Sequence, residues 1–155
     1  MSIIEKRLEQ LGLELPTAVS PLYRYVSVMV HNGVAYISGQ VPRINNEVPY
    51  PGKVGTDVTV EQAQRIAELC VLKGLSCLKD AIGSLDQVEQ LLKVTGYVQT
   101  APGFHEPSKV IDAASELLEK IFGEKGLHAR SVVGVAELPS NTPVEIDFII
   151  AVKQV

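Results

Sequence analysis

The segments RSVVGVA, residues 130–136, and VEIDFII, residues 144–150, decide the fold, because short runs of β-branched residues are typical of strands. Each segment also carries charge. Arg130 begins the first, and the carboxylates of Glu145 and Asp147 lie within the second. Burying a guanidinium or a carboxylate is costly unless the group is paired and hydrogen-bonded. These side chains are therefore exposed, paired or in contact with a ligand.

The remaining periodicities predict an α+β fold. In chain order they indicate a short amphipathic helix, two strands, a long helix, a third strand and a second main helix, over residues 3–11, 25–31, 34–37, 59–83, 88–99 and 107–122. The Asn32-Gly33 pair is a strong signal for a two-residue turn between the first two strands. This order describes a mixed sheet with both main helices on one face.

The chain length of 155 residues predicts a single domain over residues 1–155. Residues 1–15 are interpreted as a helical extension that is an appendage to a main domain over residues 22–153. Proline and glycine residues predict an irregular loop over residues 42–55.

The last strand is apolar on both sides, and this predicts a partner for the sheet. Its alternate residues from Val144 to Val152 point one way, yet Ile149 and Ala151 on the opposite side are also apolar. The chain is 46% hydrophobic, with a mean hydropathy of +0.16. We expect a second copy of the chain to cover this face, with Glu145 close to the seam.

Charge and hydropathy argue against several classes of function. The net charge of −4, the pI near 5.4 and the scattered basic residues disfavour nucleic-acid binding. No apolar run approaches the ~20 residues that span a bilayer, and the N-terminus lacks the apolar segment of a signal peptide. We therefore expect a cytoplasmic protein without a membrane partner.

The cysteine and histidine residues predict neither a disulfide nor a metal site. Cys70 and Cys77 lie seven residues apart in one predicted helix, beyond disulfide reach, and are interpreted as reduced core residues. His31, His105 and His128 do not lie at metal-ligand spacing. No nucleotide fingerprint or nucleophile motif occurs, so we expect no cofactor.

Arg130 and Glu145 are the leading candidates for chemistry. A guanidinium presents a rigid fork that matches a carboxylate, and a carboxylate among apolar residues has a raised pKa suited to a general base. The alternatives are an Arg130 paired with Glu145 or Glu137, and a Glu145 in an interface ion pair. Tyr25, at the start of a strand, and Gly39, where backbone can approach a ligand, are weaker candidates.

Three groups of residues together resemble the reactive intermediate deaminase family, also called YjgF-type or L-PSP endoribonuclease-like. They are Tyr25-Val26, the run YISGQVP at residues 36–42, and ARS at residues 129–131 followed by the strands through Ile146. The resemblance covers about residues 22–153. The longer N-terminus and the loop at 42–55 indicate a divergent, longer subgroup.

The resemblance implies a chorismate-mutase-like fold that assembles as a homotrimer, with the sheets forming a central barrel and with clefts between subunits. It implies hydrolytic deamination of small 2-imino or enamino acids to 2-ketoacids and ammonia. In this reading Arg130 holds the substrate carboxylate and Glu145 positions the attacking water. Tyr25 shapes the pocket and Gly39 offers a backbone contact.

Two residues depart from the family pattern and keep other functions open. Val132 stands where a cysteine is usual, so only its backbone carbonyl can serve, and Asp112 stands where an asparagine is usual. These departures favour, as an alternative, a regulatory trimer that binds 2-ketoacids without turnover. An endoribonuclease is a weaker alternative, because little in this acidic chain would hold RNA. An Arg130 held by an acid of its own chain, with no cavity beside it, would indicate a shared fold without shared chemistry.

Overall fold

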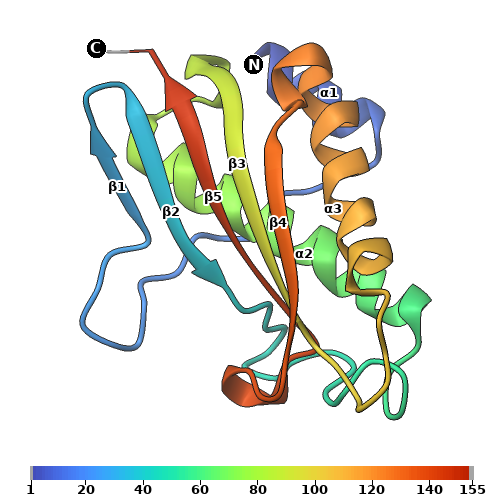
Figure 1. Cartoon of the computed structure of the whole chain (residues 1–155). Coiled ribbons are helices and arrows are strands. Elements are labelled where there is room, and N and C mark those ends of the chain that lie inside the picture. Colours follow the sequence, from blue (N-terminus) through green and yellow to red (C-terminus); the bar gives the residue numbers. More distant parts are fainter. Residues whose placement is uncertain (1, 154–155) are drawn as a thin grey trace.

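A five-stranded sheet in the order β1-β2-β5-β3-β4 forms the frame of the structure, a computed structural model that describes residues 2–153 (Figure 1). The strands are β1 Val28–His31, β2 Val34–Gln40, β3 Val88–Gln99, β4 Ala129–Val135 and β5 Val144–Val152. The α-helices are α1 Ile3–Gln10, α2 Val60–Ile82 and α3 Pro107–Phe122. The predicted α+β fold and both main helices are confirmed.

The sheet is mixed, as predicted. β3 and β4 run parallel and are joined by α3, whereas the other neighbouring strands are antiparallel. β5 is the central strand, between β2 and β3, and β4 and β1 form the two edges. The two segments that decide the fold are therefore separated by β3.

The helices α2 and α3 both lie on one face of the sheet, as predicted (Figure 1). We call this the covered face. Along β5 the residues Val144, Ile146 and Phe148 are buried against the helices, with exposures of 0 to 2%. Gly74 of α2 permits this close packing, because a Cβ there would lie 2.8 Å from Cε2 of Phe148. Cys70 and Cys77 are buried and free, as predicted.

The first hairpin is confirmed, but its first strand begins later than predicted. Asn32 and Gly33 both have positive φ, 49° and 74°, which is the geometry of a type I′ turn. β1 begins at Val28 rather than at Tyr25. Tyr25 N–H donates to the carbonyl of Tyr23 at 2.9 Å, and this local bond bends the backbone away from the extended form. The prediction that Tyr25 lies on a strand is therefore wrong.

The helix α1 is part of the core rather than an appendage. It begins with a capping box between Ser2 and Glu5. The carboxylate of Asp86 accepts hydrogen bonds of 3.0 Å from the first backbone N–H groups, those of Ile3 and Ile4. Leu8 is 4% exposed within the main core. An acid 82 residues away in sequence thus fixes the start of this helix.

The segment between β2 and α2 is irregular, as predicted for residues 42–55, but it is anchored. Val54 N–H donates to the carbonyl of Gln99 at 2.8 Å, and the carbonyl of Val54 accepts from Ala101 at 3.0 Å. A bridge between Ile44 and Glu47 closes a tight turn. These contacts tie the segment to the end of β3. In residues 2–153 no helix is long and apolar enough to span a membrane.

Candidate functional site

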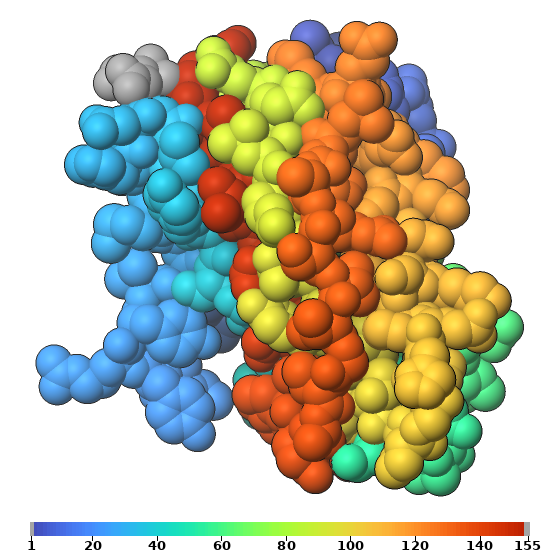
Figure 2. Space-filling view, viewed as in Figure 1, coloured from blue at the N-terminus to red at the C-terminus, as the bar shows by residue number. Residues whose placement is uncertain are grey.

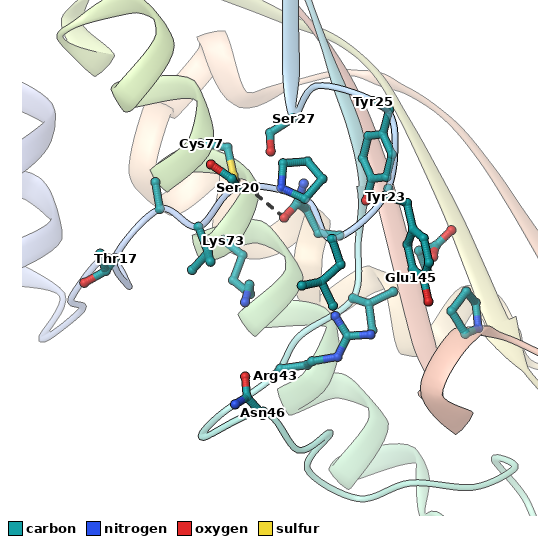
Figure 3. A pocket seen from close by; sticks show the side chains of 18 of the residues that line it. Thr17, Ser20, Tyr23, Tyr25, Ser27, Arg43, Asn46, Lys73, Cys77 and Glu145 are labelled. Carbon is teal, nitrogen blue, oxygen red and sulfur yellow. Dashed lines mark hydrogen bonds between the residues drawn. The ribbon is translucent and has the colours of Figure 1, made fainter.

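We call the opposite face of the sheet the open face. A hollow of about 500 Å³ lies at the sheet edge beside the end of β2, and it reaches from α2 to the open-face side chain of Glu145. Its walls come from the segment of residues 17–25 before β1, from the end of β2 and the segment after it, from α2 and from β5 (Figure 3). Tyr25, Gly39 and Glu145 all line it. In Figure 2 the blue segment before β1 stands away from the strands on this side of the molecule.

Gly39 lies directly against the side chain of Glu145. A Cβ at Gly39 would lie 2.8 Å from Oε2 and 3.0 Å from Cδ of Glu145. The register between β2 and β5 shifts between Ile37 and Gln40, so Gly39 lies in an irregularity at the strand end. The absence of a side chain at Gly39 therefore makes room for the carboxylate.

Burial, and next the neighbouring charge of Asp147, raise the pKa of Glu145 above its ordinary value. Burial likewise raises the pKa of Asp147, whose carboxylate accepts a hydrogen bond of 3.1 Å from the Tyr97 hydroxyl. Two half-buried carboxylates thus share the open face of β5. A carboxylate with a raised pKa accepts and returns a proton more readily near neutral pH.

Two cations, Arg43 and Lys73, also line the hollow (Figure 3). Nη2 of Arg43 donates to Oγ of Ser140 at 2.6 Å. The sequence analysis missed both residues. The available signal for Lys73 was a charge at helical spacing between Cys70 and Cys77, at the edge of the buried stripe of α2. In residues 2–153 no three His, Cys, Asp or Glu side chains gather in a way that would hold a metal ion.

Arg130 lies elsewhere, at the start of the edge strand β4. Its Nη1 donates to Oδ1 of Asp112 at 2.8 Å and to Oγ of Ser115 at 3.1 Å. Ser115 in turn lies 2.9 Å from Nε2 of His128. The alternative pairing of Arg130 with Glu145 or Glu137 is wrong, since Asp112 is the partner.

One side of the Arg130 guanidinium remains available. Both observed bonds use Nη1, and Nε and Nη2 have no hydrogen-bond partner among the residues that the structure describes. The side chain is 24% exposed. Asp112 and Ser115 therefore fix the guanidinium and leave its Nε and Nη2 edge, which is the edge that suits a carboxylate.

The structure divides the candidate residues into two groups. In the sheet register Arg130 is opposite the buried Val94, so it lies on the covered face, and Asp112 of α3 contacts it. Val132, two residues further along β4, is on that same face and packs against the core. Glu145 is opposite Tyr97 and lies on the open face with Gly39 and Tyr25.

The two groups do not meet within one chain. The sheet separates Arg130 from Glu145, and Arg130 does not line the hollow that contains Glu145. The two candidates that the sequence joined in one site are thus apart in the single chain.

Comparison with known proteins identifies the class. The fold is the YjgF/chorismate-mutase-like fold, and a family model with the description "YjgF/chorismate_mutase-like, putative endoribonuclease" matches residues 5–151. Protein TCP17 of Trypanosoma cruzi is 36% identical over 148 residues, which cover 95% of this chain and 92% of TCP17. A Lactococcus lactis protein named "Putative regulator AldR" is 32% identical, over 91% of this chain and 94% of its own.

A crystal structure supports the same assignment. A protein of unknown function from Agrobacterium tumefaciens is 41% identical and superposes with a TM-score of 0.89, over 97% of this chain and 94% of its own. The chain therefore belongs to the YjgF family, which includes the Rid and RutC proteins, as its sequence motifs indicated. Rid proteins are imine deaminases.

Proposed function

We propose that the protein hydrolyses small 2-imino or enamino acids to 2-ketoacids and ammonia, in clefts between the subunits of a homotrimer. The observation that carries the proposal is the hollow at the sheet edge, where Glu145 has a raised pKa and lies against Gly39. Membership of a family that includes imine deaminases supports it.

Because of the position of Arg130, a complete cleft would need a contact between two subunits. Within one chain Arg130 is held by Asp112 and lies across the sheet from Glu145. A single chain alone therefore does not bring Arg130 and Glu145 into one site. A cleft that contains both residues needs two copies, one that contributes Arg130 from the edge strand β4 and one that contributes Glu145.

The open face has the composition of a surface that another copy would cover. Met29 and Tyr36, which are opposite each other on β1 and β2, are 57% and 49% exposed. Tyr25 is 53% exposed. Contiguous exposed apolar side chains favour an interface. We propose that the three sheets face each other as a central barrel, with the helices outside.

The proposed mechanism needs no group beyond these side chains. The free Nε and Nη2 edge of Arg130 binds the substrate carboxylate and fixes the imine carbon in the cleft. Glu145 takes a proton from a water molecule, whose oxygen forms a bond to the imine carbon. With the substrate in its iminium form, Glu145 returns this proton to the carbinolamine nitrogen and the C–N bond breaks with release of ammonia. The hydroxyl proton passes to the Glu145 carboxylate as the C=O bond of the 2-ketoacid forms. Tyr25 forms part of the wall, and the backbone of Gly39 and of Val132 contacts the substrate.

The test is the rate of 2-ketoacid formation from freshly generated 2-aminoacrylate. The wild-type protein should accelerate the reaction above its spontaneous rate. Arg130→Gln and Glu145→Gln should each lower kcat/KM by about a hundredfold, because each removes a charge-assisted contact with substrate or water. Arg65→Gln, on the exposed side of α2, is the matched control and should retain activity. No acceleration, or an unchanged rate in Arg130→Gln, contradicts the proposal.

A second candidate is a regulatory trimer that binds 2-ketoacids without turnover. It is favoured by Asp112 and Val132, which stand where the deaminase pattern has an asparagine and a cysteine. A relative named as a regulator gives further support. Calorimetry should then show saturable 2-ketoacid binding that Arg130→Gln abolishes, with no hydrolysis of imines. Absence of binding contradicts this candidate.

A further inference from the structure

We propose that the hollow beside Glu145 selects imino acids with a second carboxylate, and that Arg43 and Lys73 hold that distal carboxylate. This inference rests on the proposed deamination, and it names a substrate class, the 2-imino dicarboxylic acids. Arg130 of a second copy holds the carboxylate next to the imine, and the two cations of the hollow hold the other one.

The charge of the hollow is the first support. Arg43 and Lys73 are its two cations, and Glu145 is its one acid among the residues that the structure describes. The net charge of the lining is therefore positive, in a chain whose net charge is −4. A concave site lined by one sign of charge attracts ligands of the opposite sign.

Within the described part of the chain, the two cations of the hollow have no acid partner of their own, unlike the four cations that form ion pairs. Lys79 is paired with Glu5, and Arg130 with Asp112. In residues 2–153 neither Arg43 nor Lys73 has an acid within 4.0 Å, although both line the same hollow as Glu145. Their charges are thus not neutralised by side chains of their own chain.

Arg43 is held in place for binding. Its Nη2 donates to Oγ of Ser140, and its Nε and Nη1 have no partner among the described residues. The backbone on either side is fixed, because Pro42 is buried and Ile44 pairs with Glu47. A guanidinium with a fixed position loses less entropy when it binds a ligand.

The two cations reach the hollow from different elements. Lys73 extends from α2 and Arg43 from the segment after β2, while Glu145 lies on the other side with Tyr23 and Tyr25 (Figure 3). The imine carbon would lie beside Glu145, and a side chain that extends across the hollow would bring its terminal carboxylate to Arg43 and Lys73. A monocarboxylic imine would leave both cations to water.

The expected effect is a preference rather than an absolute requirement. A hydrogen bond to a charged group contributes about 1.5–3 kcal/mol. We therefore expect kcat/KM to favour the dicarboxylic imine by roughly 10- to 100-fold over a monocarboxylic imine of equal length.

The experiment compares two imines of the same chain length, generated in situ by amino-acid oxidases from glutamate and from norvaline. The measured quantity is the ratio of their kcat/KM values, from ketoacid release. The wild-type ratio should be at least about tenfold in favour of the glutamate imine, and it should fall toward one in Arg43→Gln and in Lys73→Gln. Arg65→Gln is the control and should keep the wild-type ratio. A wild-type ratio near one, or a ratio unchanged in both hollow variants, overturns the inference.

A binding measurement tests this inference independently of the proposed deamination. If neither imine is hydrolysed, calorimetry with 2-oxoglutarate and 2-oxopentanoate gives the same comparison without turnover. Tighter binding of 2-oxoglutarate that Arg43→Gln abolishes supports the hollow as a dicarboxylate site, although the deamination has failed. Equal affinity for the two ketoacids overturns the inference. Thermal unfolding of each variant shows whether its fold is retained.

Discussion

The two faces of the sheet differ in how deeply a single chain buries their side chains. On the covered face, α2 and α3 bury the alternate residues of β5 to 3% exposure or less. On the open face the intervening residues of the same strand, Glu145 and Asp147 among them, are only half-buried. The covered face is therefore complete within one chain, while the open face, with its exposed apolar residues, is the surface that we propose a second copy covers.

The largest expected effect is on the covered face. Phe148→Ala removes a side chain that is 2% exposed and packed against Gly74. It should lower the free energy of unfolding by about 3–5 kcal/mol, because it leaves a cavity in a close-packed core. Urea unfolding measures the loss. Tyr36→Ala, at 49% exposure on the open face, is the matched comparison and should cost much less in the separated subunit, with any further loss dependent on protein concentration, because a second copy would cover this residue. Equal losses would remove the distinction between the faces.

Gly39→Ala should act on activity and hardly on stability. Its Cβ would lie 2.8 Å from Oε2 of Glu145, so the carboxylate must move, and a displaced base should lower kcat by about tenfold. Gly134→Ala gives a similar contact, 2.9 Å from Oγ1 of Thr100, away from Glu145, and should retain most activity. Steady-state kinetics on both variants tests this. Full activity in Gly39→Ala would show that the position of Glu145 is unimportant.

Asp112→Asn should strengthen the binding of a substrate carboxylate by Arg130. The amide oxygen can still accept the bond from Nη1, but the competing negative charge is gone. Because exposed ion pairs contribute about 0–1 kcal/mol, KM for a carboxylate substrate should fall by at most about fivefold, with little change in kcat. A higher KM would mean that the charge of Asp112 supports binding rather than weakening it.

The smallest effect concerns stability and pH. The pKa of Glu145 is raised in the folded protein, so the ionised carboxylate lowers the free energy of unfolding at pH values above that pKa. The loss disappears below about the ordinary value of 4.5, because the carboxyl group is then protonated in both the folded and the unfolded protein. Glu145→Gln should therefore have a slightly higher Tm than the wild type at pH 7 to 8, and the same Tm at pH 4. Calorimetry across this range measures it. A lower Tm in Glu145→Gln at neutral pH would contradict the direction of the shift.

The sequence predicted the elements well, because helix and strand periodicities are local. The predicted range of the long helix, residues 59–83, and the turn at Asn32-Gly33 are confirmed by the structure, in which Thr59 caps α2 and Gly83 ends it. The predicted start of β1 was wrong. The alternation of apolar and polar residues suggested a strand from Tyr25, but the hydrogen bond from Tyr25 N–H to the carbonyl of Tyr23 bends this segment.

The site was less predictable, because its contacts join distant parts of the chain. Sequence analysis singled out both Asp112 and Arg130, but their ion pair depends on how α3 packs beside β4. It missed Arg43 and Lys73, which come together only when the segment after β2 folds against α2. The docking of α1 depends on Asp86 in the same way.

The central claim is that Arg130 and Glu145 of different copies form one cleft, and complementation between two inactive variants tests it most directly. Arg130→Gln and Glu145→Gln, each inactive alone, are co-expressed in equal amounts so that trimers contain both. If each cleft takes Arg130 from one subunit and Glu145 from another, about one cleft in four is intact, and about a quarter of the wild-type deaminase activity should return. Mixed trimers that remain as inactive as each variant alone would contradict the account.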